Sequence, residues 1–224
     1  PTGDRLVYAA LGDLWTASLP GGALQRLTDD DFVDLSPTFS PDGRSVVWVS
    51  DRSGKAELWR LTLEDGRTEQ LTDLPEPVNL PVFSPDGRSV AFLRDALTSV
   101  FLGATIQVLE LDSRALRQIS PPMFGPSAPA WSPDGTTLAV YHRAPSNSRF
   151  REGLNVVRLL AADGEGPGRF LSFVEGESLG RRQFNRPAWL RRGDFVYRFD
   201  GGLWLASLAP DGTFGPARRI AAVG

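Results

Sequence analysis

The chain is a succession of short apolar runs separated by turns that are rich in glycine and proline. One set of runs occupies Val46–Val49, Val90–Leu93, Leu138–Tyr141 and Phe195–Tyr197. A second set, in which apolar and polar residues alternate, follows at Glu57–Leu63, Thr105–Leu111, Leu154–Leu160 and Leu203–Leu208. Runs of about four to seven residues rich in Val, Leu, Trp and Phe are typical of strands in a sheet that is buried on both faces. The pattern therefore predicts an all-β protein.

A tetrapeptide marks the period of an internal repeat. Ser-Pro-Asp-Gly begins at Ser40, Ser84 and Ser132, and an aromatic residue precedes it each time. Pro187-Ala188-Trp189-Leu190 is a degenerate fourth copy, because it parallels Pro129-Ala130-Trp131-Ser132. The N-terminus carries the end of one further unit, so that five units are visible, over residues 5–29, 32–73, 77–120, 124–172 and 182–220.

Each unit fits a four-stranded antiparallel meander. In Pro-Asp-Gly the proline supplies a negative φ, the glycine tolerates a positive φ, and the aspartate accepts hydrogen bonds from turn amides. Sheets of this kind, which recur roughly every 40–58 residues, typically stack radially as a β-propeller. We therefore predict a single domain over residues 1–224, a β-propeller of about five blades. The first unit begins at Arg5 on its second strand, so its blade is expected to have three strands and to receive none from the C-terminus.

The repeat resembles a known family. Segment 36–73, which ends in Gln70-Leu71-Thr72-Asp73, is similar to the TolB-type WD40-like repeat, also called the PD40 repeat. The resemblance covers nearly the whole chain and is strongest over residues 32–120. It implies a propeller, but the same repeat occurs in periplasmic TolB, in the propellers of prolyl-oligopeptidase-like enzymes and in many surface proteins. The N-terminal α/β domain of TolB has no counterpart here, and TolB has six blades, so the resemblance transfers no partner residues by position.

The composition excludes several kinds of chemistry. The 224 residues include no cysteine and a single histidine, His142, so disulfides, thiol catalysis and a multi-histidine metal site cannot form within one chain. Gly-x-Ser-x-Gly occurs once, at residues 176–180 between two repeat units, whereas P-loop and Gly-x-Gly-x-x-Gly motifs are missing. We expect no catalytic residues, no metal and no cofactor. The net charge of −3 offers no field to hold a nucleic acid. No apolar stretch is long enough to span a membrane.

Binding residues are predicted on one face of the propeller. The loops from strand four to the next strand one share this face with the loops between strands two and three, whereas the uniform Ser-Pro-Asp-Gly turns lie opposite and are interpreted as structural. Its longer loops carry arginine interleaved with phenylalanine, a combination that suits protein interfaces and anionic groups. The predicted binding residues are Arg143, Arg149, Phe150, Arg151, Arg181, Arg182, Phe184 and Arg186. The alternative is that the sequences of these loops vary without a functional constraint. Their arginines would then be solvated or would pair with Glu152, Glu175 and Glu177.

Other residues that could bind a ligand or take part in catalysis are interpreted as structural. The aspartates 29, 30, 31 and 34 offer oxygens to Ca²⁺, but their spacing matches no calcium loop, so we expect a solvated acidic turn and keep calcium as the alternative. His142 is interpreted as a hydrogen-bonded surface or core group. The tryptophans occupy equivalent strand positions and are interpreted as packing residues of the repeat: Trp15, Trp48, Trp59, Trp131, Trp189 and Trp204.

Three functions remain open at this point. The preferred hypothesis is a non-catalytic, monomeric propeller that recognises a protein partner or a small anionic ligand on its loop-rich face. The second is the propeller of a prolyl-oligopeptidase-like serine peptidase whose catalytic domain is absent from this chain. The third is a hydrolase or lyase that uses carboxylates at the channel mouth. Lack of cysteine and the family resemblance favour a bacterial, periplasmic or extracellular location.

Overall fold

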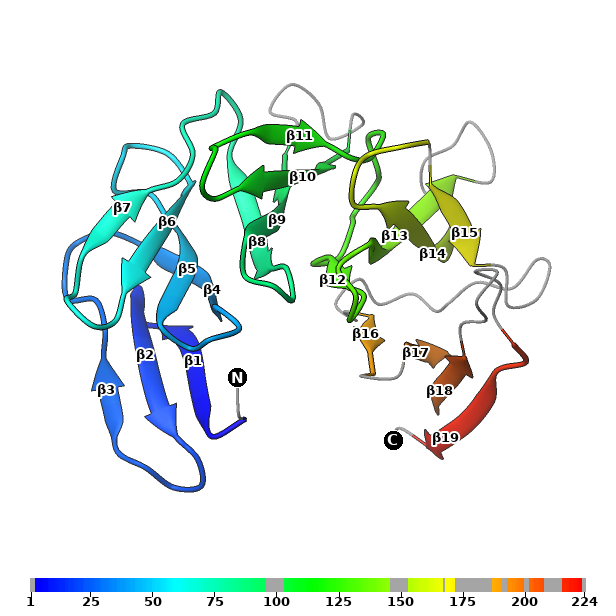
Figure 1. The fold of residues 1–224 in the computed structure, drawn as a ribbon, viewed down its shortest axis with the longest axis horizontal. Helices are drawn as coiled ribbons and strands as arrows, with labels where there is room; N and C mark the ends of the chain where they lie inside the picture. The colour runs from blue at the N-terminus through cyan, green and yellow to red at the C-terminus, as the bar shows by residue number, and fades with distance from the viewer. Residues whose placement is uncertain are drawn as a thin grey trace. The chain divides into compact units, whose positions relative to one another are not determined.

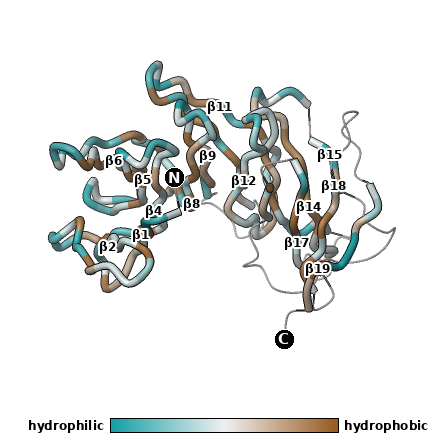
Figure 2. The backbone as a smooth tube through the Cα atoms, turned by 60° about the horizontal axis from the view of Figure 1, so that its bottom comes forward, coloured by the Kyte–Doolittle hydropathy of each residue, from teal (hydrophilic) through white to brown (hydrophobic). Residues whose placement is uncertain are grey.

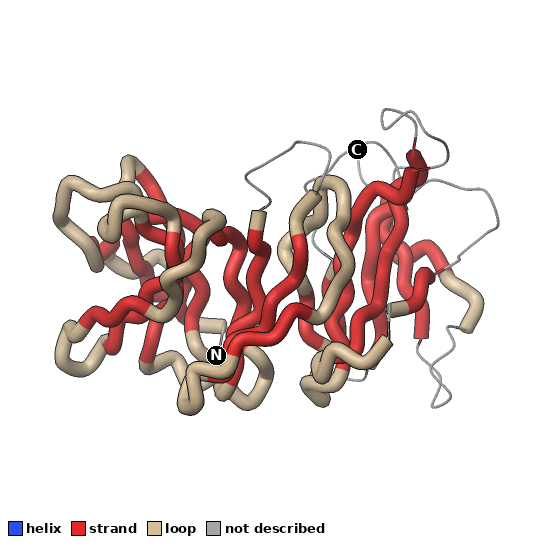
Figure 3. Tube along the Cα trace, turned by 90° about the horizontal axis from the view of Figure 1, so that it is seen from above, coloured by secondary structure: helices blue, strands red, loops and turns tan. Residues whose placement is uncertain are grey.

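The structure is a computed structural model that describes residues 3–95, 103–145, 153–166, 168–171, 187–190, 193–199, 202–207 and 215–222. These residues form 19 strands and no helix (Figure 3). The described part of the chain therefore contains no helix that could cross a membrane. The prediction of an all-β fold is confirmed.

The strands form five antiparallel sheets that follow one another along the chain (Figure 1). The first sheet contains β1 (Arg5–Ala10), β2 (Asp13–Ser18) and β3 (Leu24–Arg26). The second contains β4 (Asp34–Phe39), β5 (Ser45–Ser50), β6 (Glu57–Thr62) and β7 (Thr68–Gln70). The third contains β8 (Val78–Phe83), β9 (Ser89–Arg94), β10 (Thr105–Glu110) and β11 (Leu116–Gln118).

The fourth sheet contains β12 (Ala130–Trp131), β13 (Thr137–Pro145), β14 (Gly153–Ala161) and β15 (Arg169–Leu171). The fifth contains β16 (Ala188–Trp189), β17 (Asp194–Phe199), β18 (Gly202–Ser207) and β19 (Arg218–Ala222). Every sheet is a meander in which each strand pairs with the next, so the sheets are the blades of a five-bladed β-propeller. Blade 1 has three strands, and β19 pairs with β18 in blade 5, so both predictions about the first blade are confirmed.

The chain divides into two compact units, which are described separately. Unit 1 comprises residues 1–97 and 107–117, and unit 2 comprises residues 98–106 and 118–224. Blades 1 and 2 belong to unit 1 together with most of blade 3, whereas blades 4 and 5 belong to unit 2.

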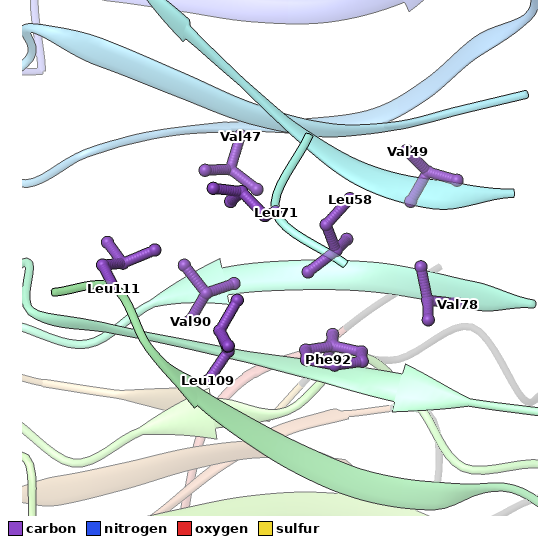
Figure 4. Close-up of a cluster of buried hydrophobic side chains, with 9 residues drawn as sticks. All are labelled: Val47, Val49, Leu58, Leu71, Val78, Val90, Phe92, Leu109 and Leu111. Carbon is purple, nitrogen blue, oxygen red and sulfur yellow. The ribbon is translucent and has the colours of Figure 1, made fainter. Parts of the chain in front are cut away.

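Each sheet of unit 1 buries apolar side chains between itself and the next. In Figure 4, valines and leucines of blade 2 point toward Val78, Val90, Phe92, Leu109 and Leu111 of blade 3. The residues that blade 2 contributes to this core are Val47, Val49, Leu58 and Leu71. Because neighbouring residues of a strand face opposite ways, the alternate positions of β5 instead pack with Leu14 of blade 1: Val46 and Trp48. Blade 2 is therefore apolar on both faces, as predicted.

Unit 2 has a comparable core between blades 4 and 5. Tyr141 and Leu159 of blade 4 pack with Phe195 and Tyr197 of blade 5. The Phe195 ring meets Trp189 edge-on, with ring centroids 5.2 Å apart. Four of the six tryptophans belong to these cores, which supports their interpretation as packing residues: Trp48, Trp59, Trp189 and Trp204. Figure 2 shows hydrophobic stretches in strands such as β9 and β14 and hydrophilic stretches in the turns.

The Ser-Pro-Asp-Gly turns are held by hydrogen bonds among their own residues. In the turn between β8 and β9, the Ser84 hydroxyl donates to Asp86 Oδ1 at 2.6 Å and accepts from the Ser89 amide at 2.9 Å. Asp86 Oδ1 also accepts from the Arg88 amide at 3.1 Å. The hydroxyl and the amide stabilise the carboxylate and lower the pKa of Asp86, and equivalent bonds lower the pKa values of Asp42 and Asp134. The structural interpretation of these turns is confirmed.

Removal of one turn carboxylate tests this role. We expect Asp86→Ala to lower the free energy of unfolding by about 1 kcal/mol, because the Ser84 hydroxyl and the Arg88 amide lose their shared acceptor. Urea denaturation of the purified chain measures the change. The control is Asp112→Ala, at an exposed position, which should stay within about 0.5 kcal/mol of the wild type. Equal effects of the two substitutions would contradict the proposed role of the turn.

Candidate functional site: the loop surface of blades 1 and 2

The structure describes one of the eight predicted binding residues, Arg143. Its amide donates to the Phe124 carbonyl oxygen at 2.9 Å, and Arg143 is half-buried and pairs with Asn155 near the end of β13. The other seven lie outside the described residues: Arg149, Phe150, Arg151, Arg181, Arg182, Phe184 and Arg186.

His142, next to Arg143, is a core residue of blade 4. It is 6% exposed, and its ring lies 5.8 Å from the ring of Phe170. Nδ1 lies 3.2 Å from the Arg143 carbonyl oxygen, so Nδ1 is the nitrogen that carries the proton and donates. Nε2 is buried and has no hydrogen-bonding partner among the described residues. Burial, and to a smaller extent the charge of Arg158, lower the pKa of His142 to about 4. The ring is therefore neutral at neutral pH.

Three connections come together at one end of blades 1 and 2: the β1–β2 turn, the β3–β4 loop and the β5–β6 loop. The Asp34 amide donates to the Gly12 carbonyl oxygen at 2.8 Å, which joins the first two connections. The Val33 amide donates to Asp51 Oδ1 at 2.8 Å, which joins the second and third. Within unit 1, the two loop classes thus share one face, as predicted.

Arg52 anchors the β3–β4 loop to blade 2. Its guanidinium donates to both Asp34 oxygens at 3.1 and 3.2 Å, and its Nε donates to Ser50 Oγ at 2.9 Å. It also forms an ion pair with Asp30 at 3.2 Å. Three aromatic rings surround it, with centroids 5.1–5.7 Å away, those of Phe32, Trp48 and Trp59. Because the Arg52 side chain is only 11% exposed, these contacts hold the loop in one conformation.

The expectation of a solvated acidic turn is wrong for Asp34. This carboxylate is fully buried and accepts a hydrogen bond from Trp48 Nε1 at 2.8 Å in addition to those from Arg52. Asp29, which is 81% exposed at its side chain, pairs with Arg26 at 2.6 Å. Two arginines therefore partly neutralise the acidic segment. No cluster of three or more His, Cys, Asp or Glu side chains suited to a metal ion occurs among the residues that the structure describes.

Apolar side chains project to solvent above this anchored loop. Leu11 is 98% exposed, Phe32 is 43% exposed and Val33 is 46% exposed. They lie close together because the Gly12 carbonyl meets the Asp34 amide. We call these three residues, with the exposed carboxylates of Asp29, Asp31 and Asp51 beside them, the loop surface.

Leu11 is the most informative member of the loop surface. Leu11 and Gly12 form the two-residue turn between β1 and β2, with φ values of +57° and +91°. Such turns favour Asn-Gly or Asp-Gly, because leucine rarely adopts a positive φ. A leucine that is both strained and solvent-exposed adds nothing to the fold, and an exposed apolar cluster is typical of an interaction site. The sequence signal was therefore Leu-Gly in a hairpin turn, and our sequence analysis missed it.

The comparisons with known proteins place this β-propeller in a family. Residues 2–152 match the family described as the Tricorn protease N-terminal beta propeller domain. The match covers more than half of the chain, so the chain belongs to this family.

Related proteins align over short segments. Tricorn protease homolog 1 of Streptomyces coelicolor is 39% identical over 57 residues, which are 25% of this chain and 5% of that protein. The Tol-Pal system protein TolB of Bordetella pertussis is 42% identical over 45 residues, which are 20% of this chain and 10% of TolB. The alignments thus span only a small part of these relatives.

Solved structures share the fold over nearly the whole chain. TolB from Acinetobacter baumannii has a TM-score of 0.65 at 18% identity, with 98% of this chain and 53% of that chain covered. An oligogalacturonate lyase in complex with manganese has a TM-score of 0.70 at 16% identity, with 98% of this chain and 62% of that chain covered. At such identities the similarity establishes the propeller fold. Together with the family match and the TolB alignment, this fold similarity confirms the prediction of a TolB-like propeller.

The buried His142 makes stability depend on pH. Its pKa is about 4 in the folded chain and about 6.5 when unfolded, so between these values the unfolded state binds the extra proton and stability falls as pH falls. From about pH 7.5 to about pH 5 this group should remove about 2 kcal/mol of the free energy of unfolding. We expect His142→Phe, measured by urea denaturation at both pH values, to abolish that part of the loss. An unchanged pH dependence in the variant would contradict the burial of a neutral imidazole.

Proposed function

We propose that this chain is a non-catalytic recognition propeller and that the loop surface binds a polypeptide segment that combines basic and apolar side chains. The exposed, strained Leu11 beside Phe32 and Val33 is the observation that carries the proposal. Clustered apolar side chains supply the desolvated centre of an interface, and charged groups at the rim select the partner.

Charge determines the kind of partner. The loop surface and its anchor contain the aspartates 29, 30, 31, 34 and 51, against the two arginines 26 and 52. The local excess of negative charge attracts lysine and arginine and repels acidic segments. Because Arg52 already fixes the β3–β4 loop, little conformational entropy is lost when a partner binds.

A second candidate function follows from the family. The family's description names a protease, and a relative in Streptomyces coelicolor is a tricorn protease homolog. The same surface would then guide peptide segments toward a peptidase domain elsewhere in a longer protein. A nucleophile motif encoded in the same gene outside the propeller repeats would support this function, because the Gly-x-Ser-x-Gly sequence at residues 176–180 lies between two repeat units of the propeller itself. The third hypothesis, a carboxylate-dependent hydrolase or lyase, would require turnover of a lactone or oligosaccharide panel by the purified chain.

The arginine-bearing loops belong to the proposal as a further contact region. Arg143, Arg149, Phe150, Arg151, Arg181, Arg182, Phe184 and Arg186 are proposed to bind carboxylates of a protein partner or a small anionic ligand. The resemblance to periplasmic TolB supports a bacterial, periplasmic or extracellular setting for both contacts. Export of the encoded precursor in a cell-fractionation experiment would test the location, and retention in the cytoplasm would contradict it.

Peptide selection tests the loop surface. We expect a phage-displayed random peptide library, selected on the chain, to yield peptides in which Lys or Arg neighbours Leu or Phe. Leu11→Asn should weaken their binding about tenfold, as truncation of an interface anchor does, while asparagine suits the positive φ of the turn. The matched control is Leu24→Asn, at another leucine, which is 63% exposed on β3. Equal losses in the two variants, or selection of acidic peptides, would contradict the proposal.

Charge reversal tests the arginine loops. We expect Arg182→Glu to weaken binding of a native partner, isolated by pull-down, by roughly thirtyfold, because an arginine fork opposite a carboxylate contributes about 2 kcal/mol or more. Titration of the partner with thermal melts alongside gives affinity and fold integrity together. Asp86→Ala, in a Ser-Pro-Asp-Gly turn, should retain full affinity. The opposite result, with affinity lost in Asp86→Ala and kept in Arg182→Glu, would place binding on the other face.

A further inference from the structure

Blades 1 and 2 share one hydrogen-bonding pattern around β2 and β6. The Leu14 amide of β2 donates to Thr28 Oγ1 at 2.9 Å, and the Leu58 amide of β6 donates to Thr72 Oγ1 at 2.9 Å. The residues beside these two bonds can therefore be compared one by one. The counterparts in the two blades are Leu11 with Lys55, Asp13 with Glu57, Arg26 with Gln70, and Asp29 with Asp73.

In blade 2 these positions hold an ammonium group. Lys55 Nζ lies 2.8 Å from Asp73 Oδ1 and 3.3 Å from Glu57 Oε1. It also donates to the carbonyl oxygen of Leu74. Glu57 is fully buried, and its Oε1 accepts a further hydrogen bond from the Leu74 amide at 2.7 Å. Its Oε2 accepts from the Thr72 hydroxyl. Both oxygens of this buried carboxylate thus have donors, as burial of a charge requires.

Blade 1 keeps the carboxylates but lacks the lysine. Asp13 is 6% exposed, and its Oδ2 pairs with Arg26 at 2.7 Å. Its Oδ1 is buried and has no hydrogen-bonding partner among the described residues. Arg26 also pairs with Asp29, whose carboxylate is exposed. One buried carboxylate oxygen of blade 1 therefore lacks the donors that Glu57 has in blade 2.

The length of the β1–β2 turn explains the missing donor. Leu11 and Gly12 are the only two residues of this turn, whereas the β5–β6 loop has the six residues 51–56. The longer loop brings Lys55 back to Glu57. Leu11, with its positive φ, projects into solvent instead and is 98% exposed. The difference lies inside blade 1, in its own hairpin turn.

The chemistry of this position selects a cation. We call Asp13, Asp29 and the carbonyl group of Asp30, which is the counterpart of Leu74, the ammonium seat. Its two carboxylates carry more charge than Arg26, which pairs with both of them. A lysine amine brings three donors on a compact charge, whereas a guanidinium is a larger planar group. Because Arg26 already lies against both carboxylates, the compact ammonium is the better complement to the one oxygen that lacks a donor.

We propose that the ammonium seat binds the side chain of a lysine in the polypeptide segment that the loop surface recognises, an inference that rests on the function proposed for that surface. The ammonium takes the place that Lys55 Nζ has in blade 2, beside Asp29 and Asp13. Asp29 belongs to both the seat and the loop surface, so apolar residues next to the lysine would contact Leu11. Arg26 competes with the lysine for the same carboxylates and limits the affinity.

The probe is a fluorescein-labelled peptide, Gly-Lys-Leu-Phe-Gly, titrated with the 224-residue protein and followed by fluorescence anisotropy. We expect replacement of its lysine by norleucine, which removes the charge and keeps the alkyl chain, to weaken binding at least about tenfold. Replacement by arginine should weaken binding about threefold, because the guanidinium fits the seat less well.

Substitutions in the protein test the seat from the other side. Arg26→Gln installs the residue of blade 2 and should strengthen binding about fivefold, because it removes the internal competitor. A purely structural role of this ion pair would not produce such a gain. Asp29→Asn should weaken binding about fivefold. The matched control is Asp112→Asn, at another exposed aspartate, which should leave the affinity unchanged. Urea denaturation of each variant verifies that it is folded.

The outcomes separate the seat from the loop surface. Equal affinities of the lysine and norleucine peptides, or weaker binding in a folded Arg26→Gln, would overturn the seat and leave the loop surface standing. Loss of affinity with norleucine but none in Leu11→Asn would support the seat and contradict the apolar part of the loop surface. Absence of binding to folded Arg26→Gln at millimolar peptide would overturn the seat. Displacement of the peptide by an equal concentration of the free diamine putrescine would contradict a polypeptide ligand.

Discussion

The blades of this chain are sheets with two apolar faces, and each face must be covered by another layer. β5 illustrates the constraint, because Trp48 packs toward blade 1 while Val47 packs toward blade 3. A sheet of this kind is stable only within a stack, which is why the repeat and the propeller fold imply each other. Within unit 1, blade 1 has a neighbour on one face, where Leu14 packs with Val46 and Trp48 of blade 2.

Polar interactions hold the two ends of the blades in different ways. The Ser-Pro-Asp-Gly turns close on themselves, so their carboxylates are occupied and uniform from blade to blade. At the opposite end of blades 1 and 2, the buried Asp34 is satisfied by Arg52 and Trp48, which belong to the next two strands and their loop. Removal of Arg52 would leave a buried charge short of donors, a large penalty in any protein. The contacts of Arg52 with Asp34 and Asp30 thus hold the loop that carries Phe32 and Val33.

The sequence was sufficient for the repeat, the strands, the turn chemistry and the three-stranded first blade, because each rests on local periodicity or on spacing between equivalent residues. It was not sufficient for Asp34, which lies in a run of aspartates that looks solvated. Its burial depends on Arg52, 18 positions along the chain, and on the meeting of two loops. Leu11 was missed for a related reason, since a single leucine in a turn is conspicuous only when its φ and exposure are known. The seven undescribed binding residues stay a prediction.

The central claim is that blade 1 has three strands and that, among the described strands, β1 pairs with β2 alone. Residue-resolved hydrogen–deuterium exchange of the isolated protein tests it most directly. The account predicts that the amides of Val7 and Ala9 exchange at least about a hundredfold faster than those of Val47 and Val49, because none of the described strands pairs with their side of β1. The amides of Leu6 and Tyr8, which face β2, should exchange slowly. Protection of Val7 and Ala9 equal to that of Val47 and Val49 would contradict the account, because it would mean that the edge is already paired.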